Sequence, residues 1–99
     1  MRLEYFDING RALLARNLLD FCKVEYEDKR LTQPEFGQGK REGKYTYGQV
    51  PALFLDDGTP LTQSISIARY IGRNYRGPNG EQLYPTRDAD TCYQIELLI

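Results

Sequence analysis

The chain has 99 residues and no histidine, and this absence excludes several kinds of catalytic site. Without an imidazole there can be no Ser-His or Cys-His nucleophile pair, and the commonest metal ligand is missing. The two cysteines, Cys22 and Cys92, lie far apart in the sequence, so no Cys-x-x-Cys redox centre or zinc knuckle is formed. Any chemistry must therefore depend on Tyr, Arg, Lys, Cys or carboxylate side chains, and we expect no metal site.

The sequence also lacks a strong charge bias and a long apolar run. Its formal net charge is -1, with acidic and basic residues interspersed, which removes the electrostatic basis for general nucleic-acid binding. No run approaches the length of a membrane span, and residues 1–5 do not begin a secretory signal. We therefore expect a soluble, cytoplasmic protein that binds neither nucleic acid nor membrane, with a modest core.

Hydrophobic periodicity and turn residues predict the order βαβ, long loop, ββα. The predicted strands are 2–6, 25–31, 52–55 and 59–62, and the predicted helices are 11–23 and 64–75. Because the second strand returns after a helix, it should lie parallel to the first. The polar connection 32–47 has room for at most one short, irregular helix, and connections of this length are usually functional or mobile.

Each predicted helix carries an apolar stripe. In the first helix Leu14, Leu18 and Cys22 recur at every fourth position, with Ala15 and Leu19 beside them, which predicts one buried face. Cys22 is therefore expected to be an ordinary core residue. The inner side of the second helix should carry Ile67, Ala68, Ile71 and Tyr75.

The end of the chain predicts a linker and the start of one more helix. Residues 76–80 break the second helix, and 81–85 continue as a linker. Thr86 can cap the next helix, with Asp88 and Asp90 in its first turn, where acidic groups are favourable. We expect this helix to be incomplete at Ile99.

Residues 48–64 combine a proline-bent loop, a β-hairpin and a helix start. Pro51 restricts Val50 to extended geometry, so the Val50 N–H and C=O can turn outward and pair with the backbone of a ligand. Gln63 and Ser64 stand where a helix should begin, and free backbone N–H groups there attract a carboxylate. The segment therefore predicts a binding site for an extended, negatively charged peptide.

Three stretches of the chain carry a family resemblance. Residues 3–12 (LEYFDINGRA), 48–53 (GQVPAL) and 63–71 (QSISIARYI) resemble the N-terminal domain of a cytosolic glutathione transferase, most closely the tyrosine-type sigma class. The resemblance implies an α/β, thioredoxin-like fold with a mixed four-stranded sheet. Residues 1–80 would form the glutathione-binding domain, and residues 81–99 the linker and first helix of an incomplete, all-helical C-terminal domain.

The resemblance implies catalytic roles for two residues. Tyr5 matches the tyrosine whose hydroxyl donates a hydrogen bond to the glutathione sulfur and so favours the reactive thiolate. Arg11 matches an arginine that adds positive field beside the sulfur, supported by a helix N-terminus. The ordinary alternative is that Tyr5 is one of eight tyrosines and Arg11 a solvated surface charge.

The resemblance also implies how glutathione is bound. Val50 would pair with the cysteinyl backbone before a cis-Pro51, Gln63 and Ser64 would hold the γ-glutamyl group, and Gln49 would add polar contacts. Ser64 on its own is equally typical of a helix N-cap. In the predicted loop, the more loosely matching Phe36 and Lys40 would reach the glycyl end.

Two other positions leave alternatives open or depart from the family pattern. Tyr47 matches an aromatic that in some relatives inserts into the partner subunit, but packing over Pro51 is equally ordinary for such a residue. Asn9 stands where many tyrosine-type members have an arginine. Near the position of a carboxylate that the family supplies across the dimer, the sequence offers Cys92, Tyr93 and Glu96, with no clear equivalent.

The implied activity is that of a transferase. It would conjugate glutathione, as co-substrate and without another cofactor, to small electrophiles, prostaglandin or lipid-type compounds among them. We expect a homodimer when the C-terminal domain is present. Much of the electrophile pocket would lie in that domain, so the activity of these 99 residues alone stays open. The alternative function is a non-catalytic glutathione-binding or protein-interaction module with the same fold.

Overall fold

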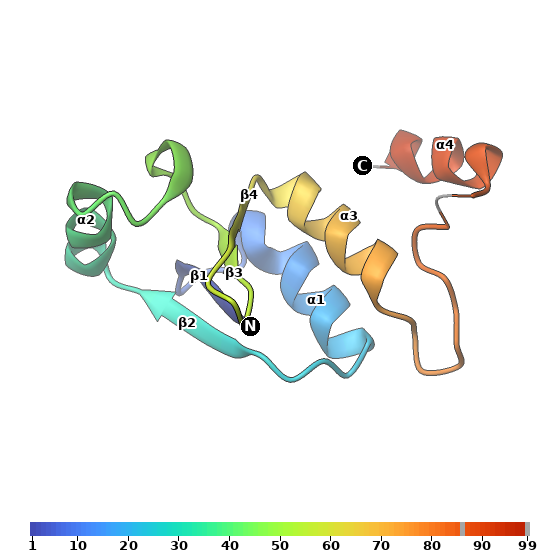
Figure 1. The fold of residues 1–99 in the computed structure, drawn as a ribbon, viewed down its shortest axis with the longest axis horizontal. Coiled ribbons are helices and arrows are strands. Elements are labelled where there is room, and N and C mark those ends of the chain that lie inside the picture. Colours follow the sequence, from blue (N-terminus) through green and yellow to red (C-terminus); the bar gives the residue numbers. More distant parts are fainter. Residues whose placement is uncertain (86, 99) are drawn as a thin grey trace.

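A computed structural model describes residues 1–85 and 87–98, and it contains a mixed four-stranded sheet (Figure 1). Strands β1 (Arg2–Phe6), β2 (Glu27–Leu31), β3 (Ala52–Phe54) and β4 (Pro60–Thr62) lie in the order β2-β1-β3-β4. Strand β1 pairs with β2 in parallel and with β3 antiparallel, and β3 pairs antiparallel with β4. The predicted thioredoxin-like fold is thus confirmed.

Two helices lie side by side on one side of the sheet (Figure 1). They are α1 (Leu13–Phe21), which follows the 3-10 turn η1 (Gly10–Ala12), and α3 (Ser64–Asn74). The side chains of Ile67, Ala68 and Ile71 on α3 are buried as predicted, whereas Tyr75 is only half-buried. Ile67 and Ile71 form the main core together with Leu3, Leu19 and Leu53.

The predicted buried stripe of α1 was right for Ala15 and Leu19 and wrong for Leu14 and Cys22. Ala12, Ala15 and Leu19 face the core, whereas Leu14 is exposed and Cys22 is only half-buried. The buried face of the helix is centred on the side of Ala15 and Arg16, which leaves Leu14 outside it. Both stripes satisfy the helical period, and periodicity alone does not choose between them.

The segment after β2 is more regular than predicted. It contains α2 (Gln33–Arg41), which lies apart from α1 and α3, beyond the end of β2 (Figure 1). Thr32 and Glu35 form a reciprocal capping box: the Glu35 N–H donates to Thr32 Oγ1 at 3.2 Å, and the Thr32 N–H donates to Glu35 Oε1 at 2.9 Å. The sequence contained this signal, but two glycines inside the helix, Gly37 and Gly39, obscured it.

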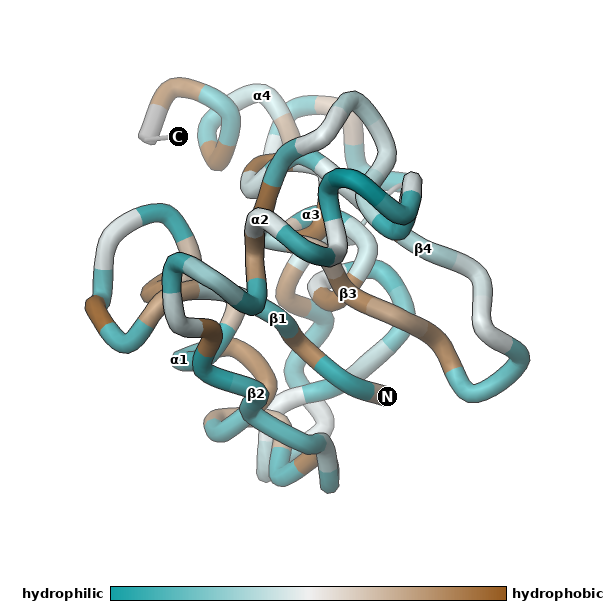
Figure 2. The backbone as a smooth tube through the Cα atoms, turned by 90° about the vertical axis from the view of Figure 1, so that its left-hand side faces the viewer, coloured by the Kyte–Doolittle hydropathy of each residue, from teal (hydrophilic) through white to brown (hydrophobic). Residues whose placement is uncertain are grey.

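A second, smaller hydrophobic cluster joins α2 to the sheet. Phe36 of α2 lies 5.3 Å from Phe6 and 5.6 Å from Tyr45, measured between ring centroids. Gly39 permits this packing, because a Cβ there would lie 2.6 Å from Cε2 of Tyr45. Viewed from the side of α2, the largely hydrophobic β3 runs between β1 and the paler β4, and the hydrophilic β2 lies on the other side of β1 (Figure 2).

The last helix is α4 (Ala89–Leu98), which lies beyond α3 (Figure 1). The predicted cap, Thr86, lies outside the described residues. Asp88 caps the first turn instead, because its Oδ1 accepts the N–H of Thr91 at 3.1 Å. No helix in the described part of the chain is long and apolar enough to cross a bilayer.

Two carboxylates hold elements together. The buried Glu4 on β1 accepts hydrogen bonds from Tyr45 Oη at 2.7 Å and Arg2 Nε at 2.7 Å, and it pairs with Lys44 Nζ at 3.0 Å. Burial opposes ionisation of Glu4, but these three contacts outweigh it and lower its pKa below the ordinary value. On α4, Arg69 and then Tyr84 hold the pKa of Glu96 at about 2.

We predict that Tyr45→Phe lowers the free energy of unfolding by about 1.5–3 kcal/mol, because a hydrogen bond to a buried charge is lost. The control Tyr47→Phe, at a side chain that is 78% exposed, should change it by less than about 0.5 kcal/mol. The pKa of Glu4 is lowered in the folded state, so the ionised carboxylate stabilises the fold. This contribution to the free energy of unfolding is complete above the ordinary pKa of 4.5 and is lost as the pH falls through the folded-state pKa. Urea unfolding from pH 7 to 3 should show the Tyr45→Phe difference shrinking with acid, and an equal difference at every pH would contradict this account.

We also predict that the Glu96 carboxylate titrates near pH 2 and not near 4.5. In Arg69→Gln the midpoint should move toward 4.5, because the guanidinium is the main cause of the lowered pKa. Carbon-detected NMR of the side-chain carboxyl measures both midpoints. An unchanged midpoint in Arg69→Gln would show that α4 is not held to α3 by this pair.

Candidate functional site

A small pocket lies where the loop before β3 meets the start of α3. It is lined by Arg11, Gln49, Val50, Pro51, Thr62, Gln63 and Ser64. The peptide bond between Val50 and Pro51 is cis, which confirms the prediction for that bond. The structure thus brings together side chains from three distant parts of the sequence.

The loop reaches the pocket through a short irregular turn, η2 (Thr46–Gly48). Tyr47 and Gly48 both have positive φ, 59° and 62°. A Cβ at Gly48 would lie 3.0 Å from Cε of Lys40, so the stem of Lys40 lies against this glycine. The turn therefore fixes the direction in which Gln49 and Val50 enter the pocket.

The start of α3 presents unpartnered backbone donors to the same pocket. Gln63 occupies the N-cap position with φ 72° and ψ 118°, and no side chain of the described residues caps the helix. Ser64 is the first helical residue, so its reading as an N-cap was wrong. The first N–H groups of a helix have no intrahelical partner and carry a partial positive charge. An anionic group in the pocket would be stabilised there.

Polar side chains connect the two walls. Gln63 Nε2 donates to Gln49 Oε1 at 3.2 Å, which joins the start of α3 to the loop. The hydroxyl of Thr62 is buried and has no hydrogen-bond partner among the described residues. Sequence reasoning missed Thr62, although its place directly before Gln63 was a signal.

Tyr5 lies behind this pocket and does not line it. Its side chain is 8% exposed, and its Oη accepts the backbone N–H of Arg11 at 3.3 Å. Because the hydroxyl oxygen accepts this bond, its own proton remains free to be donated. Arg11 lines the pocket, so the Tyr5 hydroxyl lies one hydrogen bond from the pocket wall.

Gly10 allows the hydroxyl to take this position. A Cβ on Gly10 would lie 2.7 Å from the Tyr5 Oη, and its φ of 42° is unfavourable for other residues. In the sequence Gly10 was visible only as a turn residue. In the structure the hydroxyl end of the Tyr5 ring packs against Gly10.

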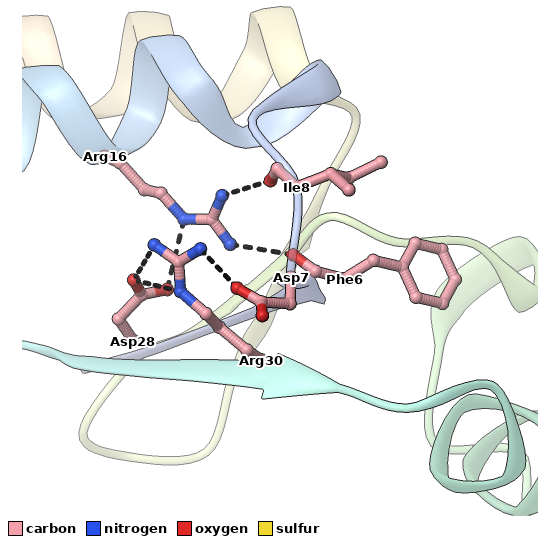
Figure 3. A network of polar contacts seen from close by, with 6 residues as sticks. All are labelled: Phe6, Asp7, Ile8, Arg16, Asp28 and Arg30. Carbon is pink, nitrogen blue, oxygen red and sulfur yellow. Dashed lines mark hydrogen bonds and ion pairs between the residues drawn. The ribbon is translucent and has the colours of Figure 1, made fainter.

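A buried arginine holds the turn between Tyr5 and Gly10 (Figure 3). Arg16 of α1 is 5% exposed, and it donates to the carbonyl oxygens of Ile8 at 2.5 Å and Phe6 at 3.1 Å. Its Nε donates to Asp28 of β2 at 3.1 Å, and its Cζ lies 5.9 Å from the Tyr5 ring centroid. Sequence reasoning missed this residue; the signal was an arginine directly after Ala15, on the face that proves to be buried.

A second arginine extends this network at the surface. Arg30 of β2 donates to Asp7 at 2.8 Å and to Asp28 at 2.9 Å (Figure 3). Asp28 thus joins the buried and the exposed guanidinium groups. The turn after β1 is fixed from both sides.

Two of the predicted binding residues do not line the pocket. Phe36 is half-buried in the second hydrophobic cluster, where its ring packs against Phe6 and Tyr45. Lys40 is exposed, with its Nζ 6.0 Å from the Phe36 ring centroid, and its stem lies against Gly48, which precedes the pocket residues Gln49 and Val50. Tyr47 projects outward with 78% of its side chain exposed, so the alternative that it packs over Pro51 was wrong.

Of the three residues considered on the last helix, only Glu96 makes a side-chain ion pair in the described structure. Its carboxylate is bound by Arg69 and Tyr84 of the same chain. Cys92 donates to the carbonyl oxygen of Pro85 at 3.0 Å, and Tyr93 is exposed. Glu96 therefore serves within this chain to attach α4 to α3.

Comparison with known proteins agrees with this arrangement. The family described as "Glutathione S-transferase, N-terminal domain" matches residues 1–73. Glutathione S-transferase 3 of Caenorhabditis elegans is 39% identical over 74 residues, which is 75% of this chain and 34% of that protein. Human hematopoietic prostaglandin D synthase is 36% identical over 73 residues, 74% of this chain and 35% of that protein.

The fold of the chain is also similar to that of a solved structure. The crystal structure of a major nematode-specific glutathione transferase from Caenorhabditis elegans superposes with a TM-score of 0.82 at 29% identity, covering 98% of this chain and 43% of the other. The chain spans about a third of the length of the two relatives named above. It belongs to the glutathione S-transferase family, and its residues 1–73 match the N-terminal domain of that family.

Proposed function

We propose that the chain binds glutathione in the pocket between the cis-Pro51 loop and the start of α3, and that Tyr5 stabilises the glutathione thiolate. The observation that carries the proposal is the convergence of Val50, Gln63 and Ser64 on one pocket, with the Tyr5 hydroxyl one hydrogen bond behind it. Residues 1–80 form the proposed glutathione-binding unit.

The peptide backbone of glutathione would pair with Val50. Among the described residues, neither the N–H nor the C=O of Val50 takes part in a backbone hydrogen bond. An extended ligand can add to such a free backbone unit as a strand adds to a sheet edge. This pairing would place the cysteinyl residue beside Pro51.

The γ-glutamyl group would occupy the start of α3. Its carboxylate is favourable against the free N–H groups of Ser64 and the residues after it. Gln49 and Gln63, which already bond to each other, supply amides that can donate or accept. The unpartnered hydroxyl of Thr62 faces the same ligand from the end of β4.

The thiol would lie between Tyr5 and Arg11. Only the thiolate attacks electrophiles well, and a hydrogen bond to the anion lowers the thiol pKa. The Tyr5 proton is available for this bond, since its oxygen already accepts the Arg11 N–H. Arg11 adds positive charge at the pocket wall. Phe36 and Lys40 would act more distantly, with Lys40 reaching the glycyl carboxylate from above Gly48.

The complete reaction would be conjugation of the thiolate to a small electrophile. Prostaglandin or lipid-type substrates are one class, in keeping with the name of the human relative. Residues 81–99 would begin the all-helical domain that completes the electrophile pocket, and a homodimer would be the working form. No metal or further cofactor takes part in this proposal, because glutathione is itself the co-substrate. A module that binds glutathione without activating it is the alternative.

We predict that Tyr5→Phe retains glutathione binding within about threefold but raises the midpoint of thiolate formation by about one pH unit or more. Ultraviolet difference titration of bound glutathione measures the midpoint, and calorimetry measures the affinity. Tyr47→Phe, at an exposed tyrosine, serves as the control and should match the parent chain. Equal midpoints in the parent and Tyr5→Phe would support the non-catalytic module, and absence of binding in the parent would overturn the whole proposal.

We further predict that Gly10→Ala impairs thiolate formation, because the added methyl group would displace the Tyr5 hydroxyl. Gly43→Ala is a matched control: its φ of 72° imposes comparable backbone strain, yet nothing lies within 4 Å of the added Cβ. Both variants should lose about 1 kcal/mol or more of stability. Only Gly10→Ala should raise the thiolate midpoint, and a parallel rise in Gly43→Ala would contradict the role of this contact.

A further inference from the structure

The C-terminal end of α3 and the linker after it enclose a second hollow, of about 360 Å³. Three arginines line it, Arg73 on α3, Arg76 just after the helix, and Arg87 before α4. Its wall also contains Asn74, Gln82 and Tyr84. We call this hollow the arginine pocket. Its volume falls in the range of small-molecule sites.

The three guanidinium groups are not neutralised by neighbouring acids. Among residues 1–85 and 87–98, none of the three lies within 4.0 Å of a carboxylate oxygen. Arg76 uses one donor on the carbonyl oxygen of Gly80, at 3.1 Å, and the Cζ of Arg73 lies 5.0 Å from the Tyr84 ring centroid. A guanidinium has five N–H donors, so most of them remain available.

Two acidic residues lie near this pocket without lining it. Glu96 is bound by Arg69 and Tyr84, whereas Glu81, whose Oε2 accepts the backbone N–H of Asn79 at 3.2 Å, keeps its negative charge. The C-terminal end of α3 carries a partial negative charge of about -0.5. This charge cancels only part of the positive charge of the arginines. Among the described residues, the wall of the pocket contains three arginines and no acidic residue, so positive charge predominates at the wall itself.

We propose that the arginine pocket binds a small organic phosphate. Guanidinium groups bind phosphate oxygens in pairs of parallel hydrogen bonds, and a doubly charged phosphate matches several arginines better than a single carboxylate does. The Tyr84 ring, which already stacks with Arg73, offers a flat apolar surface to an aromatic part of the ligand. Because the wall contains both arginines and an aromatic ring, we expect an aryl or nucleoside phosphate to bind more tightly than inorganic phosphate.

This site is separate from the proposed glutathione pocket. The glutathione pocket contains the first residue of α3, whereas the arginine pocket begins at Gly72 near its last turn. Eight residues separate Ser64 from Gly72 along α3, which corresponds to about 12 Å of helix. The two sites can therefore be tested independently.

Binding of phenyl phosphate and of inorganic phosphate to the 99-residue chain, followed by phosphorus NMR at constant ionic strength, tests the proposal. We expect saturable binding of phenyl phosphate, weaker binding of inorganic phosphate, and a loss of about tenfold or more in the affinity for phenyl phosphate in the double variant Arg76→Gln/Arg87→Gln. Both side chains are exposed, so the variant should fold, which circular dichroism checks.

Two control variants locate the binding. Arg41→Gln, at an exposed arginine of α2, should bind phenyl phosphate like the parent chain. Arg11→Gln alters the glutathione pocket and should also leave phenyl phosphate binding unchanged. Equal loss in all three variants would show general charge attraction only, and loss confined to Arg11→Gln would place the phosphate at the start of α3. Either result, or non-saturable binding to the parent, would overturn the proposal.

Discussion

The buried guanidinium of Arg16 is the contact on which the geometry of the site depends. It binds the carbonyl oxygens of Phe6 and Ile8, the two groups that define how the chain turns after β1. Because that turn leads directly to Gly10 and Arg11, it also determines where the Tyr5 hydroxyl meets the backbone. Asp28 compensates the buried charge, so a contact between α1 and β2 determines the position of a tyrosine on β1.

Each end of helix α3 lies at one of the two pockets. Its first turn offers free N–H groups to the pocket beside Pro51, and its last turn carries Arg73 near the second pocket. The rigid helix keeps the two pockets at a fixed separation, while Ile67 and Ile71 anchor it in the core. One element thus positions both proposed binding sites and joins α4 through Arg69.

The sequence was sufficient for the order of the elements along the chain and for the pocket around Pro51, because Gly, Pro and the helix start impose local geometry that can be recognised without a structure. It was insufficient where several solutions satisfy the same pattern. Leu14 and Ala15 both fit a helical stripe, and only packing against the sheet decides that Ala15 is buried. Arg16 and Glu4 were missed because burial of a charge depends on partners from distant segments, which periodicity does not reveal.

The backbone at Gln63 has a consequence for how this family member can change. A residue other than glycine at φ 72° and ψ 118° is strained by about 1–3 kcal/mol, and the fold sustains that strain at the wall of the proposed glutathione pocket. Glycine at this position would relieve the strain, yet it would remove the amide that bridges to Gln49. Glutamine at this position therefore keeps the polar bridge between the two walls of the pocket at a cost in backbone strain.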